Sequence, residues 1–367
     1  MTAAYADSHL HLLAYARALG EPDLGPAAAP SVADVVVLAA EAARPRASGW
    51  AVLRGFDHSL VGDRRLLRRA ELDAVCRHPV RIRHRTGHAS LLNTAAFERL
   101  PSPPRGARLE VDDRGDPVML VGAETWLNRV CGPPLRGSVV DGLTMAARDL
   151  TAVGIDRVWD ATPRTADAVT ELRGLLHEAR FPLCVRWMRL ATDLPGSGDL
   201  EGETVKLFPE EHGLRLPEMV AAAHRRGATV AIHAVTADEL NAAVGALART
   251  GGRIEHAPLV TDAQAARMAA AGIVVVTHPG WLTSRREKHR RELTPQTRRQ
   301  LFPLRRLMDA GVELAFASDA PIEAPDPRLW VEIATARPWH SIPLSVADFA
   351  ARGAALWLRP ALELSAA

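Results

Sequence analysis

Lysine is nearly absent from this chain of 367 residues. Of its 45 basic residues only Lys206 and Lys288 are lysines, and the other 43 are arginines. Because arginine can serve in most surface positions, a retained lysine raises the question of what a primary amine supplies there. Lys288 lies in the arginine-rich stretch 285–292, where we see no such need. Lys206 lies in an apolar stretch and is considered below.

Cysteine is scarce and long apolar runs are missing. The three cysteines, Cys76, Cys131 and Cys184, are too few and too scattered for a disulfide framework or a CxxC zinc site. No apolar run reaches the roughly 18 residues that would span a membrane. The charged residues near the start of the chain exclude a secretory signal. We therefore expect a cytoplasmic protein in a reducing environment, with no membrane partner.

Charge of one sign is not in excess. Lys+Arg is 45 and Asp+Glu is 43, which leaves a net charge of +2 and no basic excess that would suit nucleic acid. Hydrophobic residues make up 47% of the chain and charged residues 24%, as is typical of a folded globular protein. A disordered chain is thereby excluded.

The second half of the chain alternates short apolar runs with amphipathic stretches. Such repeated βα units indicate a parallel sheet with crossover helices. The count of about eight or nine strands favours a closed (β/α)8 TIM barrel over an open sheet. We predict a single domain over 1–367, with an insertion near 101–136, a helix over 91–100 and a last helix near 346–356. The candidate strands include 4–10, 155–160, 182–189, 204–208, 228–233, 252–256, 273–277 and 312–317.

Side chains able to bind a metal lie at the ends of several of these strands. His9 and His11 occupy alternate positions, so both imidazoles face one side, toward the barrel interior. His233 and His256 each end a strand, and Asp319 follows the last one. In a (β/α)8 barrel the active site forms at this end of the strands. Four histidines and an aspartate there predict a site for zinc or another borderline divalent metal.

Each of these residues alone has a simpler interpretation. An HxH pair is usually chance or part of a polar rim, and a single histidine at a strand end usually makes a structural hydrogen bond. Asp319 precedes Ala320-Pro321 and could open a turn. The prediction of a metal site depends on the conjunction of these residues, in this order, at the ends of successive strands.

Lys206 fits this site in a way that arginine could not. It lies in the expected strand 204–208, where a buried ammonium is costly unless it is neutralised or modified. A primary amine can react with CO₂ to form a carbamate, an anionic ligand that can bridge two cations. The guanidinium group of arginine is always protonated and cannot do this. The alternative is an ordinary buried ion pair, for which arginine should have served.

The order HxH, Lys, His, His, Asp resembles that of the amidohydrolase superfamily. The surrounding sequence is similar to amidohydrolase family 3, the branch of N-substituted formamide deformylase-like enzymes. The matching segments are Asp7-Ser8-His9-Leu10-His11, Arg85-Thr86-Gly87-His88-Ala89 with Asn93, Val205-Lys206-Leu207-Phe208, Ile232-His233-Ala234-Val235, Arg253-Ile254-Glu255-His256-Ala257 and Ala317-Ser318-Asp319-Ala320-Pro321.

The resemblance implies a distorted (β/α)8 barrel that holds one or two ions, of zinc or a similar metal. It implies that His9, His11 and Asp319 bind the more buried ion, while His233 and His256 bind the second. It also implies that carboxylated Lys206 bridges the two and that Asp319 is the general base for a metal-activated hydroxide. The resemblance further implies that His88 contacts the substrate. The equal alternative is that His88 supports residues of the site or packs against them and does not touch the substrate.

The sequence departs from the family pattern in three places. Only six residues precede Asp7, so we expect most of the usual flanking β-sandwich to be missing. His278 stands where relatives often have glutamine, and we expect it to bind substrate, with a stray metal ligand as the alternative. The segment 209–213 lacks the Asp-Gly pair that we would expect after Lys206.

We expect a metal-dependent hydrolase of a non-peptide C–N bond, of amide or formamide type, in a small organic substrate. One alternative is ester or lactone hydrolysis, or decarboxylation, at the same metal site. Another is a shortened, catalytically weakened homologue with a regulatory role. The expected partner is a small molecule and not a nucleic acid, and a homodimer is left open.

Overall fold

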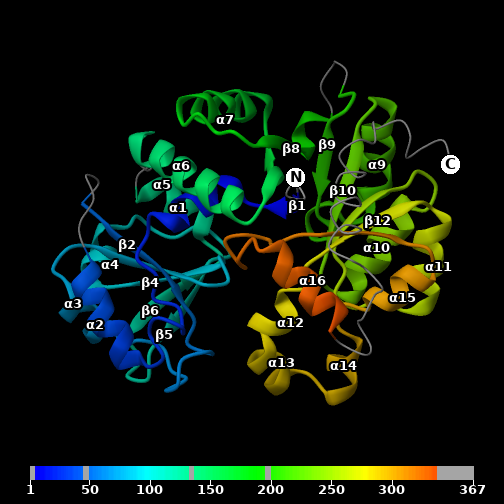
Figure 1. Ribbon diagram of the computed structural model, residues 1–367. Helices are drawn as coiled ribbons and strands as arrows, with labels where there is room; N and C mark the ends of the chain where they lie inside the picture. Colours follow the sequence, from blue (N-terminus) through cyan, green and yellow to red (C-terminus); the bar gives the residue numbers. More distant parts are fainter. Residues whose placement is uncertain (1–4, 44–48, 132–135, 195–199, 337–367) are drawn as a thin grey trace. The chain divides into compact units, whose positions relative to one another are not determined.

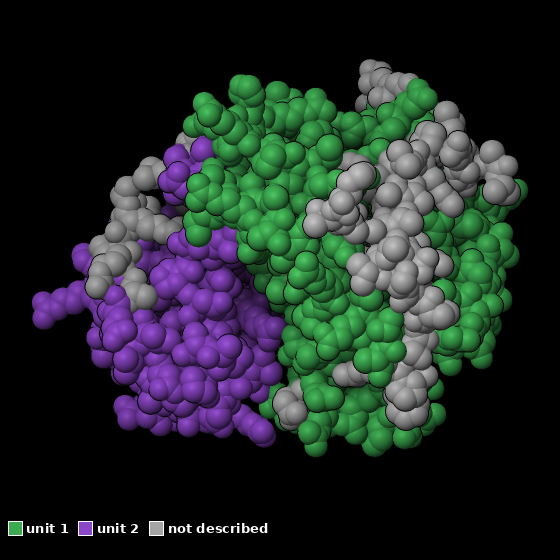
Figure 2. Space-filling model, in the orientation of Figure 1, with its two compact units in different colours: residues 1–15, 143–367 green, residues 16–142 purple. Residues whose placement is uncertain are grey.

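The computed structural model describes residues 5–43, 49–131, 136–194 and 200–336. The chain forms two compact units, coloured separately in Figure 2. Unit 1 comprises residues 1–15 and 143–367, and unit 2 comprises residues 16–142. The number of independently folding domains that they make up stays a prediction. Within the described ranges, no helix is both long enough and apolar enough to cross a membrane.

Unit 1 is built on an eight-stranded sheet in which each paired strand runs parallel to its neighbours. Strands β9, β11 and β12 are buried along their whole length, as expected where side chains pack on both faces of a parallel sheet. In sheet order the strands are β1 (Tyr5–Leu10), β7 (Ile155–Arg164), β8 (Cys184–Leu190), β9 (Thr204–Leu207), β10 (Thr229–Ala234), β11 (Gly252–His256), β12 (Ile273–Thr277) and β13 (Glu313–Phe316).

The first and last strands of this sheet are joined by the segment that follows β13. The backbone N–H of Asp319 donates to the carbonyl of His9 at 2.8 Å, and that of His11 donates to the carbonyl of Ala320 at 2.8 Å. These bonds bring the ends of the sheet together into a nearly closed barrel. The predicted (β/α)8 class is confirmed.

Helices follow most of the barrel strands and contact them on the outside (Figure 1). Two of them begin with a capping box, in which a threonine hydroxyl accepts a backbone N–H and the N3 side chain bonds back: Thr236 with Glu239, and Thr261 with Gln264. The helices of unit 1 are α7 (Ala166–Glu178), α8 (Pro209–His212), α9 (Leu216–Arg225), α10 (Ala237–Leu247), α11 (Asp262–Ala270), α12 (Trp281–Ser284), α13 (Arg286–Glu292), α14 (Pro295–Gln300), α15 (Leu304–Asp309) and α16 (Pro327–Thr335).

Strand β11 begins at a glycine for a steric reason. Gly252 has φ +131°, and a Cβ added there would lie 2.9 Å from the carbonyl oxygen of Val230 on β10. Any larger residue would push the two strands apart. Their register, in which Ala234 faces His256, positions the side chains described below.

Unit 2 is built on a five-stranded sheet with its own apolar core. Strands β2 and β3 are parallel and the other pairs are antiparallel. In sheet order the strands are β2 (Ala51–Phe56), β3 (Val80–His84), β4 (Ala89–Leu92), β6 (Pro117–Val121) and β5 (Arg108–Val111), and the helices are α2 (Val32–Ala42), α3 (Arg69–Val75), α4 (Thr94–Arg99) and α5 (Glu124–Val130); α1 (Leu12–Leu19) and α6 (Arg136–Ala152) cross the boundary between the units.

Three expectations about the elements of the chain need comment. The helix expected over 91–100 is wrong at its start: Leu91 and Leu92 belong to β4, and Asn93 caps α4 with its side chain. The segment expected as an insertion, 101–136, lies inside unit 2 and contains the β5–β6 hairpin. The helix expected near 346–356 lies outside the described residues, as does the chain beyond residue 336.

Candidate metal centre

The polar residues singled out in the sequence lie along the barrel strands or just after their carboxyl ends. His9 lies within β1 and His11 directly follows it. Lys206 is in β9, His233 is in β10 and His256 ends β11. His278 follows β12, and Asp319 lies three residues after β13. The barrel thus brings residues from six strands to one end of unit 1.

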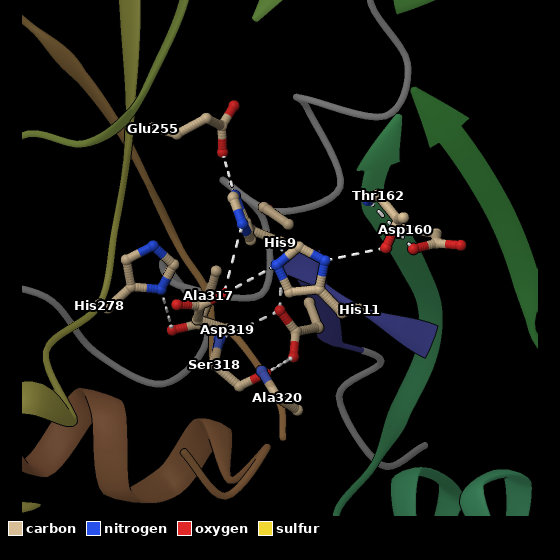
Figure 3. Close-up of polar contacts among 12 residues, drawn as sticks. His9, His11, Asp160, Thr162, Glu255, His278, Ala317, Ser318, Asp319 and Ala320 are labelled. Carbon is tan, nitrogen blue, oxygen red and sulfur yellow. Dashed lines mark hydrogen bonds and ion pairs between the residues drawn. The ribbon is translucent and has the colours of Figure 1, made fainter. Parts of the chain in front are cut away.

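Asp319 lies between two imidazoles (Figure 3). Its Oδ1 is 3.3 Å from Nε2 of His11 and 3.5 Å from Nε2 of His9. Burial alone would raise the pKa of Asp319, but its hydrogen bonds with His11 and His9 hold it well below the usual range. An ionised carboxylate and two imidazole nitrogens therefore converge, with their ligand atoms within 4.8 Å of one another.

His9 on β1 is oriented by a buried carboxylate on β11, a strand that does not pair with β1. Its Nδ1–H donates to Oε2 of Glu255, whose Oε1 in turn accepts from Nε of Arg253 at 2.6 Å. Burial would raise the pKa of Glu255, but the charges of Arg253, Lys206 and His9 hold it well below its usual range. Because an ionised Glu255 can only accept, Nε2 of His9 is the nitrogen left to face Asp319.

The pKa of His9 itself favours positive charge at this position. Burial and the neighbouring Lys206 lower it, yet Glu255 and Asp319 outweigh them, and the net shift is upward. Two carboxylates that stabilise a proton on Nε2 also stabilise a cation beside it.

Three further histidines pack beside His9. The ring centroid of His256 lies 5.0 Å from that of His9, and 4.7 Å from those of His233 and His278. Burial lowers the pKa of His233 to about 4 and that of His278 to about 3, and holds the pKa of His256 well below its ordinary value. These rings are neutral near pH 7, which is the form that binds a metal.

The buried nitrogens at this end of the barrel that lack a hydrogen-bond partner among the described residues include Nζ of Lys206 and Nδ1 of His256. Lys206 is only 2% exposed, and burial lowers the pKa of its amine to about 8. Buried polar atoms in folded proteins nearly always have partners. Their presence among neutral imidazoles and a carboxylate fits a divalent metal, which such groups bind.

The backbone around the ligands is held in uncommon conformations. His256 has φ +73° and Asp319 has φ +61°, both in the left-handed region that favours glycine. Asp7 fixes the second of these turns, because its Oδ2 accepts from Oγ of Ser318 at 2.5 Å and its Oδ1 accepts from N–H of Ser318 at 3.1 Å. Strain of this kind is concentrated at functional sites.

His11 is the most exposed residue of the group formed by His9, His11 and Asp319. The side chain of His11 is 34% exposed, whereas those of His9 and Asp319 are buried. Its Nδ1 is 2.9 Å from Oγ1 of Thr162, at the end of β7, which fixes the ring.

Two other sequence expectations fall in unit 2 or remain open. His88 is exposed in the turn between β3 and β4 of unit 2, and its role in substrate binding stays a prediction. The roles of the individual metal ligands likewise stay predictions.

Asp57, His58 and His84 of unit 2 form another group close enough for a metal. Nδ1 of His84 accepts the N–H of Thr86 at 3.3 Å, so the proton of the neutral ring is on Nε2. That nitrogen faces Oδ1 of Asp57 at 3.6 Å. This arrangement suits a contact between the N–H of His84 and the carboxylate of Asp57 better than a metal.

Sequence reasoning missed Glu255 and Trp281. The signal for Glu255 was a carboxylate and an arginine at alternate positions of an otherwise buried strand, Gly252-Arg253-Ile254-Glu255-His256. Trp281 stacks on His256 and His278, at centroid distances of 5.5 and 5.3 Å. It lies in α12, and no pattern in the sequence singled it out.

This chain matches a known sequence family and shares its fold with solved structures. The model of the amidohydrolase family matches residues 1–337. An uncharacterized metal-dependent hydrolase from Pyrococcus horikoshii OT3 is 23% identical, with a TM-score of 0.69 over 96% of this chain and 77% of its own. One from Pyrococcus furiosus is 21% identical, with a TM-score of 0.67 over 99% of this chain and 82% of its own.

At such identities the two solved structures show a shared fold. No curated protein matches the sequence. The family match, in contrast, extends over most of the chain and includes every residue of the centre described above. The chain therefore belongs to the amidohydrolase family, and it is a hydrolase that uses a divalent metal.

Proposed function

We propose that this protein hydrolyses a non-peptide C–N bond, of amide or formamide type, in a small organic molecule. The observation that carries the proposal is the buried carboxylate of Asp319, 3.3 and 3.5 Å from Nε2 of His11 and His9. A carboxylate among imidazoles at the open end of a barrel is suited both to hold a cation and to move a proton. The similarity to N-substituted formamide deformylase-like enzymes supports the amide type of bond.

The residues that would hold the metal are those that the barrel gathers. We propose His9, His11 and Asp319 as ligands of one zinc-like ion, and His233 and His256 as ligands of a second. Lys206 would join them after its amine adds to CO₂ and loses a proton, which yields an anionic carbamate. When bound, such ions lower the pKa of a water molecule toward neutrality and polarise a carbonyl group.

Asp319 would act as the general base and then as the general acid. Its carboxylate accepts a proton from the attacking water and delivers that proton to the leaving nitrogen. An amine is a poor leaving group unless it is protonated, so this transfer matters more for an amide than for an ester. His11, the partly exposed ligand beside it, lies on the path by which a substrate reaches this carboxylate.

A panel of substrates tests the proposal. Zinc-reconstituted protein should hydrolyse at least one small N-substituted amide or formamide, with release of the amine, and should act more slowly on the ester of the same acid. Hydrolysis of esters or lactones alone would move the activity to the alternative class. Absence of turnover in a zinc-loaded protein would favour a catalytically weakened homologue.

A further inference from the structure

We propose that His278 is a metal ligand rather than a residue that binds substrate. When a single ion is bound, His278 would form an all-imidazole set with His9 and His256, in place of the two-ion assignment above, in which these two histidines hold different ions. The inference rests on the metal site of the proposed function and adds to that site a residue at a position where relatives often have glutamine.

The position of His278 favours a ligand over a substrate contact. It directly follows β12, and its ring is 0% exposed, whereas the side chain of His11 is 34% exposed. A substrate cannot touch a ring that has no accessible surface. A single metal ion that is held among the surrounding side chains can contact this ring.

The hydrogen bond of His278 leaves its Nε2 free to bind a metal. Its Nδ1 is 3.2 Å from the carbonyl oxygen of Ala317, and since a carbonyl can only accept, Nδ1 carries the proton. Nε2 of the neutral ring therefore presents a lone pair. This atom is buried and has no hydrogen-bond partner within the described part of the chain. A histidine that binds a metal usually donates its other ring N–H to a carboxylate, a backbone carbonyl or water, and this contact orients the ring.

The three rings are close enough to share one ion. Their centroids are 5.2 Å apart for His9 and His278, 5.0 Å for His9 and His256, and 4.7 Å for His256 and His278. One ligand nitrogen from each lies within 4.8 Å of the others. Because Nδ1 of His9 is bonded to Glu255, Nε2 is the atom of His9 that is left to bind an ion.

Trp281 closes this set on one side. Its ring stacks on both His256 and His278, with interplanar angles of 25° and 22°. A flat apolar wall against two imidazoles restricts their rotation and keeps bulk water away. An all-nitrogen set should bind Zn²⁺, Co²⁺ and Ni²⁺ in preference to Mn²⁺ and Mg²⁺, which favour oxygen.

The test is the zinc affinity of His278→Gln, measured by competition with a chelator. Loss of a second-shell partner typically costs about 10- to 100-fold in metal affinity, so loss of a ligand should raise the Kd by at least ~10-fold. The matched control is His224→Gln on α9, the same change at a half-buried histidine outside the ligand groups. It should leave the zinc Kd within a few-fold of wild type.

Two further readouts probe the coordination of the metal directly, and the first of them uses only the wild-type protein. Zinc K-edge X-ray absorption of the wild-type protein loaded with one equivalent of zinc should show at least three imidazole nitrogens, and the visible spectrum of the Co²⁺ protein should change in His278→Gln. An unchanged zinc Kd and Co²⁺ spectrum in that variant would overturn the inference. So would an X-ray absorption spectrum of the wild-type protein that shows fewer than three imidazole nitrogens.

These outcomes separate the inference from the proposed function. Hydrolysis of an amide together with unchanged zinc affinity in His278→Gln would leave the function standing and remove His278 from the ligands. A weakened zinc site in His278→Gln, with no amide hydrolysed by wild type, would keep His278 as a ligand and refute the proposed reaction.

Discussion

His9 and Glu255, 246 positions apart in the chain, form a buried hydrogen bond between Nδ1 of the imidazole and Oε2 of the carboxylate. Both side chains are almost completely buried, and Arg253 neutralises the carboxylate from its other side. This pair decides which nitrogen of His9 faces Asp319. The metal site therefore depends on a residue that is not itself a ligand.

Glu255→Gln should weaken zinc binding by about 10- to 100-fold while the ligands remain in place. The glutamine side chain keeps the size of glutamate but loses the charge that holds the proton on Nδ1 of His9. Competition with a chelator measures the effect. Glu239→Gln is the matched control, since Glu239 is also a buried carboxylate but caps α10. Equal zinc affinities for the two variants would show that Glu255 has only a packing role.

Lys206→Arg should lose the second ion and most activity if Lys206 is a carbamate ligand. Arginine keeps the charge and approximate length, so an ion-pair role should tolerate the change, whereas its guanidinium cannot add CO₂. Lys206→Ala leaves space that acetate or formate could fill, with partial recovery of turnover. Activity of the arginine variant within a few-fold of wild type, without rescue of the alanine variant, would reject the bridging role.

Asp319→Asn should reduce kcat by at least ~10²-fold, on the scale of general acid–base catalysis. The amide keeps the shape of the side chain and can retain some metal, but it cannot accept the proton. Steady-state kinetics together with metal analysis of the same sample measure both effects. A near-normal kcat would mean that Asp319 only shapes the turn.

Asp57 in unit 2 gives a prediction about acid stability. Burial would raise its pKa, but the neighbouring imidazole of His84 and the hydrogen bonds from Ser59 outweigh burial and hold the pKa below the ordinary value. A lowered pKa stabilises the fold above the unfolded-state pKa of about 4, and this contribution is lost as the pH falls further. Asn imitates the protonated form, so Asp57→Asn should cost about 1–3 kcal/mol at pH 7.

The matching measurement is urea unfolding of chelator-treated wild type and Asp57→Asn at pH 7, 5, 4 and 3. The difference in the free energy of unfolding should be constant from pH 7 to 5 and should shrink below about pH 4. A difference that stays the same at pH 3 would contradict the assignment of the effect to the charge of Asp57.

The barrel could be predicted because its signals are local. Each strand of the second half is a short apolar run followed by an amphipathic helix, and the metal-capable residues end those runs, as His256 ends β11. Residues 91 and 92 were assigned to a helix because their apolar character alone does not distinguish a strand from a helix start. Pairing with β3 and β6 decides it, and such pairing is set by residues distant in sequence.

The residues that orient the ligands could not be predicted either, because they come from segments distant in sequence. His9 and Glu255 meet only because β1 and β11 converge in the barrel interior, and the bond of Asp7 to Ser318 joins segments 311 positions apart. Burial of His278 also depends on packing, here against Trp281. Spacing in the sequence identified chemically capable residues but not which atom of each one is free.

Removal of the metal tests the central claim most directly. The protein should be purified with its metal, stripped with a chelator, and titrated with zinc while hydrolysis of an amide substrate is followed. Activity should vanish in the stripped protein and return in proportion to added zinc, with saturation at one or two equivalents. Full activity in protein shown by elemental analysis to be free of metal would contradict the account.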